Sequence, residues 1–399
     1  MENNLYKDEK RNIIQNQNKE NNINKKRKRN YGIDCARIIS MILIINHHII
    51  YHGGPFSSVN PKDNLYQLLV FYNIICCSGV NIFGMISGCV CSFSYKYSNL
   101  FYLLFLTFFY NFLIALLFYI FKPNLIKDLY FFLYPLVISD YWYFNQYFLM
   151  YFFLPIINEG LSKINEKTMK SLVINLFLIF SCFGEIKYYN QRVFKEDIFY
   201  LKQGFSYIWL LILYLYGSYI GKFKINNNAS PNYFYYSKFF LMLILAAFIR
   251  MKKIVYYQPK KLILNIDYCC PAEVIISLSI VIIFSNIKIK NKYLLKIISF
   301  FSPLTYGVYL IHNHRLVRVK LIKNHFLWLT NLKLYNLFII EMLCSFVIFL
   351  LCSLIDFLRL LIFNFLKIRQ IITFIIINIQ NLSNKLLIYI SKQTEIITI

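Results

Sequence analysis

Apolar runs of about 17–25 residues recur along this chain and are separated by short polar connections. Runs such as 101–121 and 338–354 are apolar on all helical faces, as expected for helices surrounded by lipid or by other helices. Transmembrane β-strands would alternate in polarity over about ten residues, and glycine and proline are scarce, at 12 and 9 of 399 residues. The chain is therefore predicted to be all-α, a polytopic transmembrane helix bundle.

The composition excludes most other classes of protein. Hydrophobic residues make up 58% of the chain and charged residues 15%, against about 45–50% and about 25% in soluble globular proteins. Disordered proteins, disulfide scaffolds and simple nucleic-acid modules are excluded, so the expected surroundings are a lipid bilayer and no nucleic acid. The ten cysteines lie mostly in apolar segments without a CxxC motif, so we expect buried thiols and no metal site.

The hydrophobic pattern predicts about ten spans within a transmembrane domain of residues 31–360. These spans lie near 33–51, 66–94, 99–121, 142–160, 168–185, 205–223, 234–250, 268–287, 303–322 and 333–356. Residues 361–399 remain rich in isoleucine but are interrupted by Asn, Gln and Lys. We therefore expect an interfacial or poorly ordered C-terminal tail there.

Residues 1–30 are polar and end in a basic run at 25–29. Beside a first span, such a run is typical of a disordered cytoplasmic tail, because positive charge is retained on the inner side of a membrane. We therefore expect a multi-pass protein of the cell (plasma or inner) membrane with a cytoplasmic N-terminus. The basic stretch 250–261 argues against this orientation, since it would face outward. The sequence indicates no oligomeric state.

The first span carries the densest set of ionisable residues. At about 100° per residue, Arg37 and His48 lie within roughly 20° of one helix face and about 16 Å apart. Asp34 precedes Arg37 by one turn and His52 follows His48 by one turn, whereas His47 is rotated by about 100°. Ionisable groups inside a membrane are costly, so this polar stripe is predicted to face protein or water. In the structural alternative, Arg37 reaches the headgroups and His48 is a hydrogen-bonded core histidine.

Two further segments carry candidate site residues. In 306–315, Tyr309 and His312 are one turn apart on an expected helix, although an interfacial aromatic belt would have the same pattern. In 79–88, small residues recur along a span, a pattern that is also typical of close helix packing.

Five segments together resemble the integral-membrane acyltransferase family 3, in the bacterial branch associated with O-acetylation of cell-surface polysaccharides. They occur in the family's order and spacing over residues 30–360. The segments are RNYGIDCARIISMILIINHHIIYHGG (29–54), VNIFGMISG (80–88), YWYFNQYFLMYFFLPIIN (141–158), YIWLLILYLYGSYIG (207–221) and SPLTYGVYLIHNHRLVR (302–318).

The resemblance implies about ten transmembrane helices, an acyl-CoA co-substrate, usually acetyl-CoA, and a hydroxyl acceptor on a carbohydrate. The family's signature of an arginine, ten residues and a histidine selects Arg37 and His48. Its later motifs select Ser87, Tyr309 and His312. Many members carry a pair of arginines after the Ser-Gly helix, where this chain offers only Lys96. The residues that hold the donor's phosphates therefore stay open.

Acyl transfer from a thioester to an alcohol requires a base for the hydroxyl proton and stabilisation of the oxyanion. His48 is assigned as the general base, acting directly or through an acetyl-His intermediate. Arg37 is assigned to the donor's phosphates or carbonyl, with Asp34 orienting it, and His52 is assigned to substrate binding. Two other functions stay open: a transporter or flippase of a glycan or anionic substrate, for which a charged stripe would also be natural, and a non-catalytic membrane scaffold.

Overall fold

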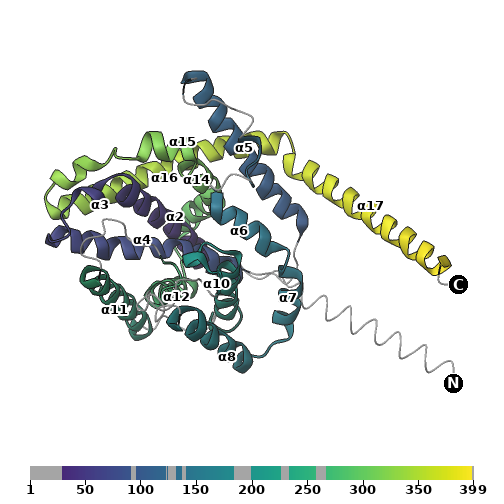
Figure 1. Ribbon diagram of the computed structural model, residues 1–399, viewed down its shortest axis with the longest axis horizontal. Coiled ribbons are helices and arrows are strands. Elements are labelled where there is room, and N and C mark those ends of the chain that lie inside the picture. The colour runs from purple at the N-terminus through teal and green to yellow at the C-terminus, as the bar shows by residue number, and fades with distance from the viewer. Residues whose placement is uncertain are drawn as a thin grey trace.

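The computed structural model describes residues 29–90, 96–122, 124, 132–136, 141–183, 199–225, 233–257 and 267–397. These residues form helices and turns and contain no β-strand, so the predicted all-α class is confirmed. The helices form a bundle from which the last one, α17 (Ile368–Ile397), extends away (Figure 1). The basic run at 25–29 lies outside the described residues, except for Arg29.

Helix α2 (Tyr31–His52) carries the predicted polar stripe. The side chain of Asn30 caps its start by accepting the backbone N–H groups of Gly32 and Ile33 at 3.0 and 3.2 Å. The helix ends before Gly54, whose φ of +107° favours glycine. Its neighbours in the bundle include α4 (Asn64–Cys89), α12 (Pro271–Asn286), α13 (Lys292–Phe301), α14 (Thr305–His312) and α16 (Leu334–Phe365).

Glycines bring α4 close to α2 and to α10 (Tyr207–Tyr219). A Cβ atom on Gly79 would lie 2.7 Å from the carbonyl oxygen of Ser40 in α2. A Cβ atom on Gly88 would lie 2.0 Å from the carbonyl oxygen of Tyr214 in α10. The expectation that the small residues of 79–88 serve close helix packing is therefore confirmed.

A buried ion pair within α16 is hydrogen-bonded to α5 (Tyr97–Phe121) and packs against α14. Both carboxylate oxygens of Asp356 accept N–H groups from Arg359, at 2.7 Å each, and one also accepts the hydroxyl of Tyr110 in α5 at 2.7 Å. Gly307 of α14 leaves room for this carboxylate, because a Cβ atom there would lie 2.0 Å from the Asp356 side chain. The charge and the hydrogen-bonding groups of the buried carboxylate are thereby satisfied within the bundle.

Among the described residues, five helical segments are long and apolar enough to cross a membrane. They are Tyr31–Ser58, Asn64–Cys89, Tyr97–Phe121, Lys292–His312 and Leu334–Phe365. The predicted count of about ten is not confirmed by these five and stays a prediction. The span predicted at 303–322 is placed differently, since the candidate segment begins at Lys292 and ends at His312.

Four of the other predicted spans correspond to shorter or interrupted helices. The one at 142–160 is divided into α6 (Trp142–Tyr151) and α7 (Leu154–Lys163), because Pro155 lacks an N–H and its ring crowds the carbonyl four residues earlier. The others match α8 (Glu166–Leu176) with a π-helix at Phe177–Phe183, α10 with a π-helix at Ile220–Lys224, and the short α12. The span at 234–250 lies within α11 (Tyr233–Tyr257).

Candidate active site

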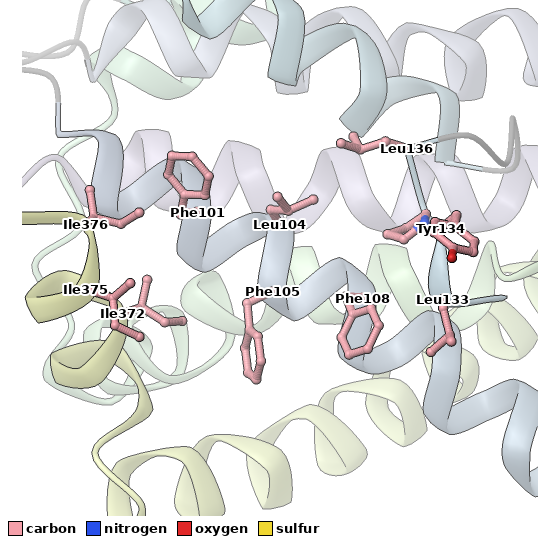
Figure 2. A pocket seen from close by; sticks show the side chains of 11 residues that line it. Phe101, Leu104, Phe105, Phe108, Leu133, Tyr134, Leu136, Ile372, Ile375 and Ile376 are labelled. Atoms are coloured by element: carbon pink, nitrogen blue, oxygen red, sulfur yellow. The ribbon is translucent and has the colours of Figure 1, made fainter. Parts of the chain in front are cut away.

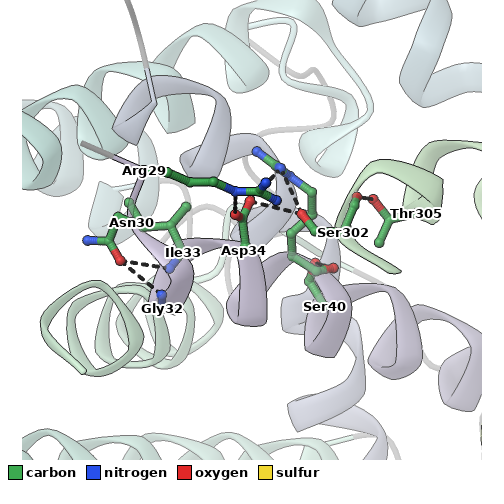
Figure 3. Close-up of polar contacts among 9 residues, drawn as sticks. Arg29, Asn30, Gly32, Ile33, Asp34, Ser40, Ser302 and Thr305 are labelled. Carbon is green, nitrogen blue, oxygen red and sulfur yellow. Dashed lines mark hydrogen bonds and ion pairs between the residues drawn. The ribbon is translucent and has the colours of Figure 1, made fainter. Parts of the chain in front are cut away.

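A cluster centred on Asp34 lies at the start of α2 (Figure 3). One oxygen of its buried carboxylate accepts Nη1–H of Arg37 at 3.1 Å and the hydroxyl of Ser302 at 2.9 Å. The other oxygen accepts Nε–H of Arg29 at 2.5 Å. Nη1 of Arg37 also lies 3.1 Å from the hydroxyl oxygen of Ser302. Two guanidinium groups thus share one carboxylate, and the three side chains together carry one net positive charge.

His48 lines a small cavity of about 40 Å³, bounded in part by α2, α4, α6 and α14. The lining is dominated by aromatic side chains. It consists of Met41, Ile44, His47, His48, Val80, Phe83, Trp142, Tyr143, Tyr268, Tyr306, Tyr309 and Asn313. A space of this size holds about three water molecules at most. An acyl donor can therefore enter only if lining side chains move.

His312 of α14 lies against His48, with 5.2 Å between the ring centroids. Its Nδ1 donates to the carbonyl of Val308 at 2.7 Å, which leaves Nε2 as an acceptor in the neutral ring. Nε2 of His312, Nδ1 of His48 and the hydroxyls of Tyr143 and Tyr309 are buried and have no hydrogen-bond partner among the described residues. Since buried polar atoms are normally paired, this concentration of unpaired groups marks a place prepared for a polar ligand.

The two other histidines of α2 have different surroundings. Nδ1 of buried His47 lies 2.8 Å from the side-chain oxygen of Asn73 and 3.3 Å from the sulfur of Cys77, both in α4. His47 is therefore anchored to the neighbouring helix. The ring of His52 meets the edge of His48 at 5.3 Å between centroids, but it does not line the cavity.

The predicted site residues thus form two groups along α2, and two of them lie apart. Tyr309 and His312 join His48 and His52 at one end, while Asp34 and Arg37 lie at the other. The hydroxyl of Ser87 donates to the carbonyl of its own helix at Phe83, at 3.4 Å. Lys96 is exposed at the N-cap of α5, where its carbonyl accepts the hydroxyl of Tyr151 at 2.9 Å. Neither residue lines the cavity.

Several lining residues were not predicted from the sequence. The ring of Trp142 stacks on Tyr268 with 5.9 Å between centroids, and the side chain of Asn81 donates to the Tyr268 carbonyl at 2.8 Å. Asn313 is held by Arg318, whose Nη1 donates to the Asn313 side-chain oxygen at 3.2 Å. Asn313 directly follows His312 and could have been suspected from that position. Nothing in the local sequence pattern around Tyr268 indicated that its side chain lines the cavity.

Comparison with known proteins assigns the chain to a family. The profile of family 3 of the acyltransferases, described as an acyltransferase domain, matches residues 30–356. The match includes Asp34, Arg37 and Ser302 of the cluster, His48 and all residues that line the cavity, and it begins just after Arg29. Comparison with curated proteins and with solved structures gave no match. Because the matched segment makes up most of the chain, the protein belongs to acyltransferase family 3, a family of membrane acyltransferases.

Proposed function

We propose that the protein is a membrane-embedded O-acyltransferase that moves an acetyl group from acetyl-CoA to a hydroxyl group of a cell-surface carbohydrate. The observation that carries this proposal is the position of His48. It lines a cavity between helices, has a second imidazole beside it, and shares a helix with Asp34 and Arg37. Membership of an acyltransferase family supports the reaction class.

The reaction requires a proton to move between oxygen and sulfur. His48 takes the proton as the acceptor's hydroxyl oxygen attacks the thioester carbonyl, and it returns the proton to the sulfur that leaves when the C–S bond breaks. In the two-step alternative, His48 itself attacks the carbonyl, the C–S bond breaks, and the CoA thiolate leaves with the imidazole proton. The acceptor's hydroxyl oxygen then attacks the acetyl group, the bond to the imidazole nitrogen breaks, and the hydroxyl proton passes to the imidazole. The hydroxyls of Tyr143 and Tyr309 are the available donors for the oxyanion, since both are unpaired and line the cavity.

The Asp34 cluster is the proposed binding site for the donor's phosphates. Arg37 was assigned to the donor's phosphates or carbonyl because a guanidinium stays charged and offers paired donors, and Arg29 lies beside it on the same carboxylate. Guanidinium groups bind phosphate through paired donors. Arg29 therefore offers a second cation in place of the arginine pair that many family members carry.

This assignment implies a direction across the membrane. Acyl-CoA is a cytoplasmic metabolite in this proposal, so the start of α2 faces the cytoplasm and the carbohydrate approaches from the His52 end. The basic run at 25–29 supports the same orientation. About 16 Å of helix separates Arg37 from His48, a distance that an extended donor arm would span. A transporter or flippase needs no acyl donor, and the family match favours acyl transfer over it.

The proposal is tested by mass spectrometry of cell-surface carbohydrates from the source cells. Cells with the gene should carry O-acetyl groups that are missing after its deletion, and the wild-type gene should restore them. The gene carrying His48→Ala should not restore them, although the protein reaches the membrane. Equal O-acetylation with and without the gene would contradict the proposed acceptor.

A further inference from the structure

A second and larger cavity lies on the outer side of α5, away from His48. It has a volume of about 550 Å³, within the range of about 300–1,000 Å³ that is usual for small-molecule sites. Four residues at helical spacing on α5 form its floor, and α17 and residues 132–136 form its two ends (Figure 2). The lining consists of Phe101, Leu104, Phe105, Phe108, Leu133, Tyr134, Pro135, Leu136, Ile372, Ile375 and Ile376. We call it the α5–α17 groove.

The groove is independent of the candidate active site. The buried side of α5 meets the cavity of His48 through the hydroxyls of Thr107 and Tyr306, which lie 2.7 Å apart. None of the residues of the groove takes part in that contact, and none of them lines the His48 cavity. Side chains of the groove can therefore be changed without touching the proposed machinery.

Positive charge gathers at the α17 end of the groove. Arg369, one turn before Ile372, donates to the side-chain oxygen of Asn99 at 2.8 Å, and its guanidinium lies 5.4 Å from the centre of the Tyr102 ring. Lys96 and Lys367 are exposed near the same helix ends. Segments 96–108 and 364–376 contain no acidic residue. The apolar groove thus ends at the guanidinium of Arg369, which Asn99 and Tyr102 hold in place. Neither of the two segments at this end of the groove supplies a carboxylate that would neutralise it.

We propose that the α5–α17 groove binds one anionic phospholipid. Its hydrocarbon tail lies along the floor from Phe101 to Phe108, which covers about 10 Å of helix. Its phosphate lies at Arg369, where the guanidinium is already oriented by Asn99 and Tyr102. Lipid of any kind would fill an apolar groove in a bilayer, so the basic end is what gives the site its preference for negative charge.

A second copy of the chain fits the groove less well. Pairing about a two-fold axis would bring the same patch of each copy together. The basic ends of two grooves, with Lys96, Lys367 and Arg369 in each, would then approach one another. Repulsion between these like charges disfavours such a dimer, whereas the same charges attract a phosphate headgroup.

Native mass spectrometry of the purified full-length protein tests the proposal. After delipidation, the protein is titrated with phosphatidylglycerol or with phosphatidylcholine. The wild type should retain one phosphatidylglycerol preferentially. Arg369→Gln should weaken phosphatidylglycerol binding about five-fold, the effect of one charge beside an anionic headgroup. It should weaken binding of phosphatidylcholine less, because the choline cation balances that lipid's phosphate, so the preference for phosphatidylglycerol should fall. Lys385→Gln, a charge removal on an exposed part of the same helix, is the matched control and should change neither.

A second variant tests the apolar part. Leu104→Trp fills the groove and should reduce binding of both lipids, whereas Leu117→Trp, at an exposed position of the same helix outside the groove, should not. Unchanged melting temperatures establish that the variants fold. An unaltered phosphatidylglycerol preference in Arg369→Gln, an equal loss in Lys385→Gln, or a lipid-free dimer as the main species would overturn the proposal.

Discussion

At the scale of single residues, the role of Arg29 can be separated from a purely structural one. Its side chain is 46% exposed and its guanidinium holds Asp34 through Nε, so its terminal nitrogens can reach a phosphate. Arg29→Gln should raise the KM for acetyl-CoA about tenfold, the loss of one charge-assisted hydrogen bond. The KM for S-acetylpantetheine, which has no phosphate, should stay unchanged.

Comparing the KM values of the two donors decides whether Arg29 binds phosphate or only supports Asp34. If Arg29 only supported Asp34, both donors would be affected alike, and that result would remove it from the donor site. Arg315→Gln provides the matched control, because Arg315 is exposed beyond the opposite end of the proposed donor path. It should leave both KM values unchanged.

Part of the candidate site follows from local periodicity alone. The face of α2 that carries Arg37 and His48 can be worked out from 100° per residue, and the structure places His48 at a cavity. The contact between His48 and His312, and the stacking of Trp142 on Tyr268, join segments far apart in the sequence. Periodicity within one helix carries no information about such pairs, because they depend on how helices cross.

At the scale of helices, the close crossing of α4 and α10 depends on the absence of side chains. Gly88→Ala would place a Cβ atom 2.0 Å from the Tyr214 backbone, so the helices must separate. We expect a loss of about 1–3 kcal/mol in the free energy of unfolding, as for other overpacked sites. Thermal unfolding in detergent measures it.

Gly160→Ala in α7 is the control for this crossing. A Cβ atom there would meet nothing within 4 Å, and alanine favours a helix over glycine. This variant should be as stable as the wild type or slightly more stable. Equal melting temperatures for the two alanine variants would show that the α4–α10 contact is looser than the structure indicates.

The buried pair that joins α16 to α5 allows a second comparison. Arg359→Met would leave the buried Asp356 carboxylate without its cation, at a cost of about 3–5 kcal/mol. Tyr110→Phe removes only one of the carboxylate's hydrogen bonds and should cost about 1 kcal/mol. Denaturant titration in mixed micelles measures both values, and a cost for Arg359→Met no larger than that for Tyr110→Phe would contradict the proposed importance of the pair.

Most helices could be located from hydrophobicity, and the errors have local causes. Apolar length predicted α2, α4, α5 and α16 within a few residues of the observed bounds, apart from the longer C-terminal end of α16. The division between α6 and α7 at Pro155 was missed because the residues on both sides are equally apolar. Hydropathy reports whether a segment can lie in lipid, whereas the backbone hydrogen bonds that proline removes decide whether the helix continues.

At the scale of the whole molecule, the proposed orientation makes a prediction about exposed connections. With the start of α2 inside and ten crossings, cysteines placed at Ser162 and Asn291 should be labelled from the cytoplasm, and one at Asn331 from outside. All three positions are exposed, and the assay uses intact cells and a background without other cysteines. Labelling of Asn291 and Asn331 from the same side would overturn both the span count and the proposed path from donor to acceptor.

The central claim is that His48 performs acetyl transfer within the membrane. The most direct measurement is the turnover of labelled acetyl-CoA by the purified protein in lipid nanodiscs, comparing wild type with two variants. His48→Ala should lower the rate at least about a hundredfold, as expected for loss of a general base or nucleophile. His47→Gln, which keeps a polar group toward Asn73, should lower the rate less than about tenfold. Equal turnover by His48→Ala and wild type, or a larger loss in His47→Gln than in His48→Ala, would contradict the account.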